Sequence, residues 1–233
     1  MGLSIVILAA GQGTRMRSVL PKVMQPLAGR PILGHVLDCA HELGADDVTV
    51  VHGHGGDVVL EAFIAEDVRW VEQAEQLGTG HAVRQALPGI PEGNRLLVLF
   101  GDVPLLTAAT LLGQLDATGA NEVSVLTVDV SDPTGYGRII RDGSHVIAIV
   151  EDGDATAEQR SIIEINTGVM VLPVDRLRTW LERIGNDNAQ GEYYLTDVIG
   201  LAVADDVTVK AVKASDPVDV MGINDRKQLA EAE

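Results

Sequence analysis

A glycine-containing loop followed by two basic residues is the part of the sequence best suited to phosphate chemistry. The loop comes directly after the apolar, β-branched segment Ser4–Leu8 and contains Gly11 and Gly13. Backbone N–H groups in such a loop can approach a phosphate closely, and Arg15 and Lys22 can neutralise its charge. The loop lacks the Gly-Lys-Ser/Thr of a P-loop and the third glycine of a dinucleotide fingerprint. The residues therefore predict phosphate binding of another type.

Two further polar segments follow predicted strands. Gln73–Thr79 comes after the short strand Val68–Val71, and Asp102 comes after the apolar strand Leu96–Phe100. Ligands of open α/β sheets bind beyond the carboxyl ends of the strands. We therefore expect both segments to meet the glycine loop at one edge of a sheet.

The first half of the chain alternates predicted strands and helices, which predicts a Rossmann-like α/β fold with a mixed, mostly parallel sheet flanked by helices. The predicted strands are Ser4–Leu8, Asp47–His52, Val68–Val71 and Leu96–Phe100. The predicted helices run from Pro31 to about Gly44, and over Val58–Ala65, Gly80–Ala86 and Ala108–Leu115.

The second half predicts a smaller antiparallel subdomain. Glu122–Val130, Gly137–Ile140 and Val146–Val150 are expected to form an antiparallel meander with a hairpin turn at Asp142-Gly143. Further strands are expected at Ile165–Val171 and Val207–Val212, and helices at Leu177–Ile184, Thr196–Ala204 and Asp225–Ala232. We expect one domain over residues 1–233, with halves at 1–118 and 119–233.

The composition excludes several classes of partner. Among 233 residues, 17 are basic and 34 acidic, so the net charge of −17 argues against binding to nucleic acid or to an anionic membrane. Cys39 is the only cysteine, which excludes an internal disulfide. His52 and His54 have no further ligands at a zinc spacing, so a loop is expected there. No signal peptide or membrane-spanning run is evident, and we expect a soluble, cytoplasmic protein.

Six stretches, in order along the chain, together resemble the pyrophosphorylase domain of the bacterial bifunctional N-acetylglucosamine-1-phosphate uridyltransferase/glucosamine-1-phosphate acetyltransferase family, within the sugar-phosphate nucleotidyltransferases. The resemblance covers essentially the whole chain. The stretches are Leu8–Met16 with Pro21-Lys22, Gln73–Ala82, Gly101–Leu105, Asp132–Ile139, Glu164–Gly168 and Asn188–Asp197.

The resemblance implies a nucleotide-binding first half and a sugar-binding second half. Gln73 and Gly78 match positions that read uracil, and a carboxamide offers a donor and an acceptor that suit an imide edge. The implied nucleotide-binding residues are Leu8, Ala9, Ala10, Gly11, Gly13, Thr14, Arg15, Lys22, Gln73, Gly78, Thr79, Phe100 and Gly101. The implied sugar-binding residues are Gly137, Glu151, Asn166, Thr196 and Asn224.

The resemblance also implies a magnesium-dependent reaction. Asp102 and Asn224 are the implied Mg²⁺ ligands, a sparse set that suits a cation which keeps its waters and takes phosphate oxygens. The oxygen of N-acetylglucosamine-1-phosphate would attack the α-phosphorus of UTP and release pyrophosphate, with Arg15, Lys22 and Asp102 as the catalytic residues. Phe100 stands where some relatives carry tyrosine, so a hydroxyl contact is lost there. The left-handed β-helix of the bifunctional family is not present in this sequence, and we expect no acetyl transfer and a monomer.

Two other functions fit the same residues. The first is transfer with another substrate pair, such as glucose-1-phosphate with dTTP or CTP, because base choice is a difference of affinities that a sequence reads poorly. The second is a non-catalytic sensor of nucleotide-sugar. A sensor would not need Arg15, Lys22 or Asp102, and the sequence contains all three.

Overall fold

A computed structural model describes residues 2–53 and 55–233 of the chain, so His54 lies outside the described residues. The strands are β1 Leu3–Ala9, β2 Pro26–Leu27, β3 Arg30–Pro31, β4 Asp47–His52, β5 Arg69–Glu72, β6 Arg95–Phe100, β7 Val123–Asp129, β8 Arg138–Asp142, β9 His145–Val150, β10 Glu164–Pro173 and β11 Val209–Lys213. The α-helices are α1 Ile32–Glu42, α2 Gly56–Ala62, α3 Thr79–Ala86, α4 Ala108–Ala117, α5 Ala157–Arg160, α6 Val174–Arg183, α7 Asp197–Ala204, α8 Pro217–Val220 and α9 Arg226–Ala232, and the 3-10 turns are η1 Thr14–Met16, η2 Lys22–Met24 and η3 Leu87–Gly89.

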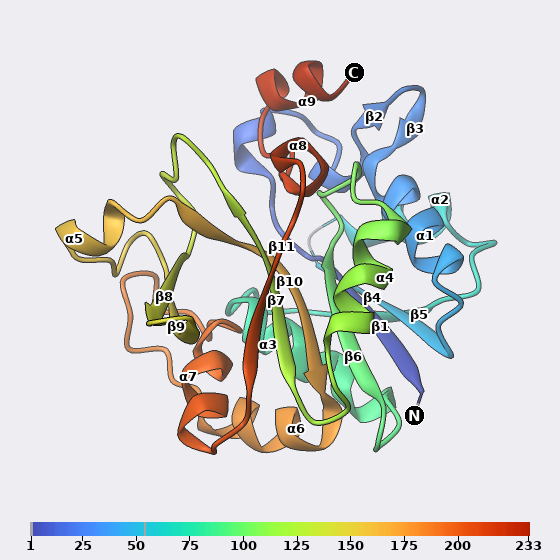
Figure 1. Cartoon of the computed structure of the whole chain (residues 1–233). Helices are drawn as coiled ribbons and strands as arrows, with labels where there is room; N and C mark the ends of the chain where they lie inside the picture. The colour runs from blue at the N-terminus through green and yellow to red at the C-terminus, as the bar shows by residue number, and fades with distance from the viewer. Residues whose placement is uncertain (1, 54) are drawn as a thin grey trace.

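A mixed sheet forms the centre of the molecule (Figure 1), with the strand order β11-β7-β10-β6-β1-β4-β5. β1 lies parallel to both β4 and β6, β5 lies parallel to β4, and β11 lies parallel to β7. Along this order β10 is the exception, because it runs antiparallel to both β6 and β7. The predicted fold class is confirmed: a mostly parallel sheet flanked by helices.

Helices cover both faces of this sheet, and each face has its own aliphatic core. Leu33 and Leu37 of α1 and Leu111 of α4 pack on one face. On the other face α3, α6 and α7 contribute a second cluster that contains the fully buried Trp180. The central strands are buried on both sides, which explains why they are continuous apolar runs instead of alternating ones.

The predicted three-strand meander is wrong. β7 pairs with β10 and β11 inside the main sheet, and only β8 and β9 form the hairpin, which attaches to β10 through Arg138 and Ile165. Six of the seven β7 residues are buried. A strand that is apolar on both faces is buried best in the middle of the sheet. Its partners there need not be the strands next to it in the sequence, which is why the meander was predicted wrongly.

The carboxyl-terminal segment returns to the opening loop. The guanidinium Nε of Arg226, at the start of α9, donates a hydrogen bond to the carbonyl oxygen of Met16 at 3.0 Å. The backbone N–H of Ile223 donates to the carbonyl of Asp102 at 2.8 Å. The carboxyl-terminal segment therefore meets the opening loop at the edge where β1 and β6 end, whereas the N-terminus lies at the opposite end of the sheet (Figure 1). Within the described ranges, no helix combines the length and the apolar character needed to cross a membrane.

Candidate active site

Two adjoining cavities open at the carboxyl ends of the central strands, and Thr79 and Phe100 line both of them. The first cavity has a volume of about 340 Å³ and the second about 200 Å³. Predicted site residues in the first are Leu8, Ala9, Ala10, Gly11, Lys22, Gln73, Gly78, Thr79, Phe100, Asp102 and Asn224. Those in the second are Thr79, Phe100, Gly137, Glu151, Asn166 and Thr196.

A cluster of one ammonium, one carboxylate and one amide lies in the first cavity. Lys22 Nζ donates to Asp102 Oδ2 in a short ion pair and to Asn224 Oδ1 at 3.1 Å. The Lys22 and Asp102 side chains are only 13% and 14% exposed, so solvent screens their attraction weakly. The oxygens of Asp102 and Asn224 therefore already hold a positive charge between them.

The glycine loop positions Lys22 by direct packing. Gly13 has the left-handed φ of +60°, and a Cβ placed on it would lie 2.5 Å from the Cβ of Lys22. Only glycine allows both this conformation and this approach. The 3-10 turn η2 then begins at Lys22 and directs its side chain towards Asp102.

Gln73 is held firmly at the far side of the first cavity. It follows the end of β5 and is 3% exposed. Its Nε2 donates to the carbonyl of Gly78 and to Nδ1 of His81, both at 3.0 Å. The segment between them is fixed in turn, because the N–H of Gly80 donates to the carbonyl of Tyr193 at 2.8 Å.

The second cavity combines an acidic and an amide side chain. Thr196 Oγ1 donates to Glu151 Oε1 at 2.9 Å. Asn166 Oδ1 accepts the N–H of Gly168 at 2.8 Å, which leaves the amide NH₂ of Asn166 to serve as a donor. Burial raises the pKa of Glu151, while the hydrogen bond from Thr196 opposes the rise. The cavity therefore offers both acceptors and donors suited to hydroxyl groups.

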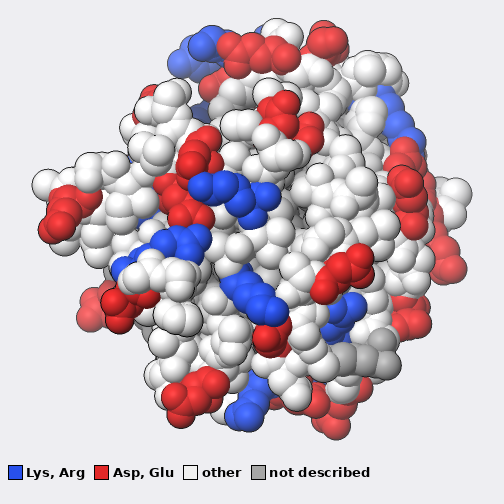
Figure 2. All heavy atoms as spheres, in the orientation of Figure 1, with Lys and Arg blue, Asp and Glu red and all other residues white. Residues whose placement is uncertain are grey.

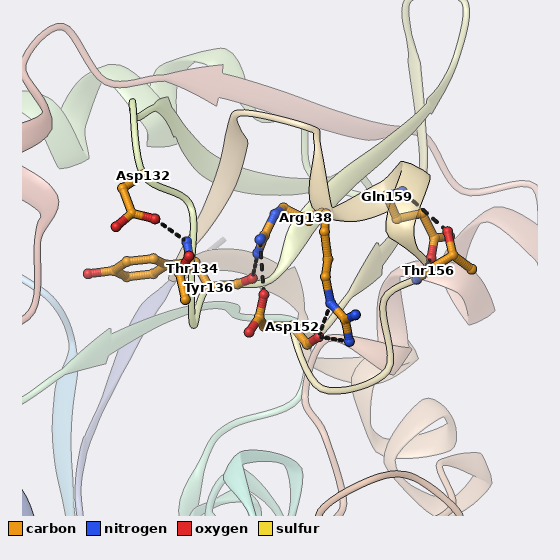
Figure 3. Close-up of polar contacts among 8 residues, drawn as sticks. Asp132, Thr134, Tyr136, Arg138, Asp152, Thr156 and Gln159 are labelled. Carbon is orange, nitrogen blue, oxygen red and sulfur yellow. Dashed lines mark hydrogen bonds and ion pairs between the residues drawn. The ribbon is translucent and has the colours of Figure 1, made fainter.

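The loop that precedes Gly137 is braced by charged groups (Figure 3). Arg138 is 2% exposed and donates to the carbonyl of Tyr136 and to Asp152 Oδ1, the latter at 2.9 Å. Asp132 Oδ1 accepts the N–H of Thr134 at 3.1 Å, which closes a tight turn. Arg138 thus fixes the position of Gly137 by holding the residues around it.

Four predicted site residues do not line either cavity. Gly101 is buried behind the first cavity, and its N–H donates to the carbonyl of Leu8 at 2.9 Å. Gly13, Thr14 and Arg15 belong to the opening loop, where Arg15 is exposed. Burial raises the pKa of Tyr136, Asp102 adds to the rise and Arg15 opposes it, so the charge of Arg15 lies near this phenol. A site role for Arg15 stays a prediction.

Several residues that the sequence analysis did not assign also line the cavities. Gln76 and Glu192 line the first, and Tyr136 and Thr167 line the second. Burial raises the pKa of Glu192. Each of these residues lies inside a motif that carried the resemblance, but their types alone gave no reason to select them.

A mostly parallel sheet, a glycine loop after its first strand and a Lys–Asp–Asn cluster at its carboxyl edge define a nucleotidyltransferase. Residues 5–182 match the model of the MobA-like NTP transferase domain. The chain belongs to this family.

Similar proteins agree with this assignment. The bifunctional protein GlmU of Azoarcus sp. (strain BH72) is 55% identical over 232 residues, which cover 99% of this chain and 51% of that protein. The bifunctional protein GlmU of Pseudomonas aeruginosa (strain LESB58) is 56% identical over 234 residues, which cover 100% of this chain and 51% of that protein. The chain therefore spans about half the length of these curated relatives.

Solved structures share the fold at low identity. A UDP-glucose pyrophosphorylase complexed with UDP-glucose superposes with a TM-score of 0.76 at 19% identity, covering 100% of this chain and 97% of that one. A putative glucose-1-phosphate thymidylyltransferase from Bacillus anthracis gives a TM-score of 0.73 at 18% identity, covering 99% of this chain and 93% of that one. At these identities the likeness establishes the fold alone.

Proposed function

We propose that the protein transfers a uridylyl group from UTP to N-acetylglucosamine-1-phosphate, giving UDP-N-acetylglucosamine and pyrophosphate. The observation that carries the proposal is the pair of adjoining cavities, with the Lys22–Asp102–Asn224 cluster in the first. The relatives named GlmU, 54–56% identical along this chain, support the choice of substrates.

We assign the nucleotide to the first cavity and the sugar to the second. Residues 1–118 supply most of the lining of the first cavity, and residues 119–233 most of that of the second. Phe100 lies between the two, and its ring packs on Gly168, where a Cβ would come within 2.4 Å of the ring. Gly168 also has a φ of +89°. Glycine is therefore required there both by the backbone conformation and by the close approach of the Phe100 ring.

A divalent cation fits the oxygens of Asp102 and Asn224, because these oxygens already hold the ammonium of Lys22. In the described part of the chain, no group of three or more His, Cys, Asp or Glu is placed to hold a metal. Two protein oxygens are nevertheless a sufficient set for Mg²⁺, which keeps waters and takes phosphate oxygens as ligands. When bound, Mg²⁺ would neutralise charge on the phosphates.

The residues of the chain would catalyse the reaction by positioning and by charge. The phosphate of the sugar substrate is ionised at neutral pH, so its oxygen can attack the α-phosphorus without a general base. Lys22, released from Asp102, would neutralise the phosphates as pyrophosphate departs. Glu151 and Asn166 would hold the sugar hydroxyls and so align the attacking oxygen.

Release of pyrophosphate tests the proposal directly. The purified chain is incubated with Mg²⁺, each of UTP, dTTP, CTP and GTP, and either N-acetylglucosamine-1-phosphate or glucose-1-phosphate. We expect release with UTP and the N-acetylated sugar, and its loss on addition of EDTA. Release with another pair would replace the substrates but keep the reaction. No release from a folded chain that binds UTP would favour the nucleotide-sugar sensor.

Glu151→Gln separates sugar binding from folding. We expect KM for the sugar-1-phosphate to rise about tenfold or more, because a charged acceptor is lost. The raised pKa of Glu151 means that the folded state binds a proton more readily than the unfolded state, so this group lowers stability as pH rises through the shifted range. The variant is therefore expected to have a higher Tm than the unmodified chain at pH 7 and an equal Tm at pH 4. A lower Tm at pH 7 would contradict this account.

A further inference from the structure

The amide of Gln73 has no N–H left to offer a ligand. A side-chain amide carries two N–H groups, and Nε2 of Gln73 gives one to the carbonyl of Gly78 and the other to Nδ1 of His81, both at 3.0 Å. Gln73 also lines the first cavity. Its Oε1 accepts no hydrogen bond from the described residues. Within this network the oxygen is the only group of the amide that remains for a ligand, whereas the sequence alone offered both a donor and an acceptor.

The amide cannot turn round without losing its bond to the carbonyl of Gly78. The carbonyl of Gly78 can only accept, and it also accepts the N–H of Ala82 at 3.1 Å. A reversed amide would place Oε1 of Gln73 against this carbonyl, and two acceptors facing each other repel. The orientation of the amide is therefore fixed by the carbonyl of Gly78, and Nδ1 of His81 then accepts the second N–H.

The same bond fixes the tautomer of His81. Because Nδ1 accepts from Gln73, the ring proton lies on Nε2. The amide nitrogen of Gln85 lies 2.9 Å from this Nε2. Because amide oxygen and nitrogen are assigned from the hydrogen-bond network, we reverse the Gln85 amide, so that its oxygen accepts the ring proton. His81 and Gln85 belong to α3, so a rigid helix holds the acceptor in place.

We propose that His81 is a positioning residue that selects the base of the nucleotide by fixing the amide of Gln73. With both N–H groups held inside the protein, Oε1 faces the ligand as an acceptor. It matches a base with a ring N–H, as in uracil or thymine, and opposes the unprotonated ring nitrogen of cytosine. This inference rests on the proposed function and extends it to the discrimination between UTP and CTP.

The expected selectivity is one-sided. A site built to receive an N–H rejects an analogue that lacks it, because the facing acceptor is then left unpaired beside another lone pair. Thymine also carries the ring N–H, so discrimination against dTTP must arise elsewhere in the cavity. The arrangement therefore predicts strong rejection of CTP and no rejection of dTTP by this contact.

Binding of UTP and CTP to the folded chain tests the proposal without relying on turnover. The dissociation constants of both nucleotides are measured by calorimetry with Mg²⁺ for the unmodified chain, His81→Leu and His81→Asn. In His81→Leu the amide keeps one anchor at Gly78, and we expect the preference for UTP over CTP to fall about tenfold. Asparagine places an amide oxygen near the position of Nδ1, so His81→Asn is expected to keep the preference within about threefold. His145→Leu, on the exposed end of β9, serves as a matched control for loss of a histidine.

The outcomes distinguish this inference from the proposed function. An unchanged preference in His81→Leu would overturn it, and so would an equal loss in His81→Leu and His81→Asn, which would show that the ring acts only by packing. If no substrate pair releases pyrophosphate, the proposed transfer fails. A preference for UTP that still depends on His81 would then keep the inference for a nucleotide-binding protein.

Discussion

Asp102→Asn is expected to lower kcat for pyrophosphate release by about 10²–10³-fold with saturating UTP and Mg²⁺. The carboxylate is 14% exposed and lies against the ammonium of Lys22, so it can hold a divalent cation beside the phosphates. Asparagine keeps the shape and one oxygen but removes the charge. The loss should appear in kcat and in the dependence of the rate on Mg²⁺ concentration, which a stopped or coupled pyrophosphate assay measures.

A matched control is available on β7. Asp129 pairs with Lys213 at 2.7 Å, and both side chains are about half exposed, at 46% and 52%. Asp129→Asn should therefore leave kcat within about twofold of the unmodified value, since exposed ion pairs contribute little. Turnover of Asp102→Asn within threefold of the unmodified chain would show that the metal assignment is wrong.

Lys22→Met is expected to have two opposite effects. The rate of pyrophosphate release should fall by about 10²-fold, because a charge that stabilises the phosphates is lost. Binding of a divalent cation to the chain without nucleotide should instead become tighter, because Lys22 Nζ occupies the space between Asp102 Oδ2 and Asn224 Oδ1. Titration with Mn²⁺ followed by electron paramagnetic resonance measures this affinity separately from turnover.

The arrangement makes this second effect specific to Lys22. Methionine fills a similar volume, so the variant removes the charge with little change in packing. Lys213→Met, which removes the exposed partner of Asp129, is the control and should change neither Mn²⁺ affinity nor rate. Unchanged Mn²⁺ affinity in Lys22→Met would show that the ammonium does not compete for the two oxygens. Lys22 would then contact only the phosphates.

These two expectations describe a site in which the metal and the lysine exchange partners. In the structure the positive charge between Asp102 and Asn224 belongs to Lys22. A divalent cation bound there would release the ammonium towards the phosphates that accompany it. Without the cation, Asp102 and Asn224 hold the ammonium of Lys22. With the cation bound, they would hold the metal, and Lys22 would stabilise the charge on the phosphates.

Regular alternation in the first half of the sequence was enough to predict its architecture. Ser4–Leu8 and Leu96–Phe100 are continuous apolar runs, and both are central strands in the structure. Whether such a segment forms a strand depends mainly on its own residues, so the hydrophobic pattern predicts it well. β7 was predicted as a strand but given the wrong partners, because pairing between distant segments depends on which faces become buried together.

Some elements gave too little signal for prediction. α5 has four residues and is held by a capping box in which Thr156 and Gln159 exchange hydrogen bonds (Figure 3). β2 and β3 have two residues each. Elements of this length are stabilised by a few specific contacts, so no periodic pattern exists for a sequence to reveal.

The net charge of the chain indicated which large partners are disfavoured, but not where a phosphate ligand would bind. The value of −17 excluded a broadly basic surface. Figure 2 shows that basic and acidic side chains alternate over the face drawn, with no continuous basic area there. The positive charges that matter for a phosphate ligand are local, and Lys22 is partly buried in a cavity and so contributes little to the surface pattern.

The sequence by itself determined the types of the groups at the site. The glycine loop, Asp102 and Gln73 follow predicted strands. The strands of a parallel sheet bring such residues to one edge, whatever the details of side-chain packing. The tertiary structure alone decided how these groups are used. Lys22 meets Asn224, which lies 202 residues further along the chain, and His81 holds the amide of Gln73 so that only its oxygen is available. A hydrogen bond forms only when the donor–acceptor distance is right to within a few tenths of an ångström and the donor points at the acceptor. Only the packed chain fixes these two quantities.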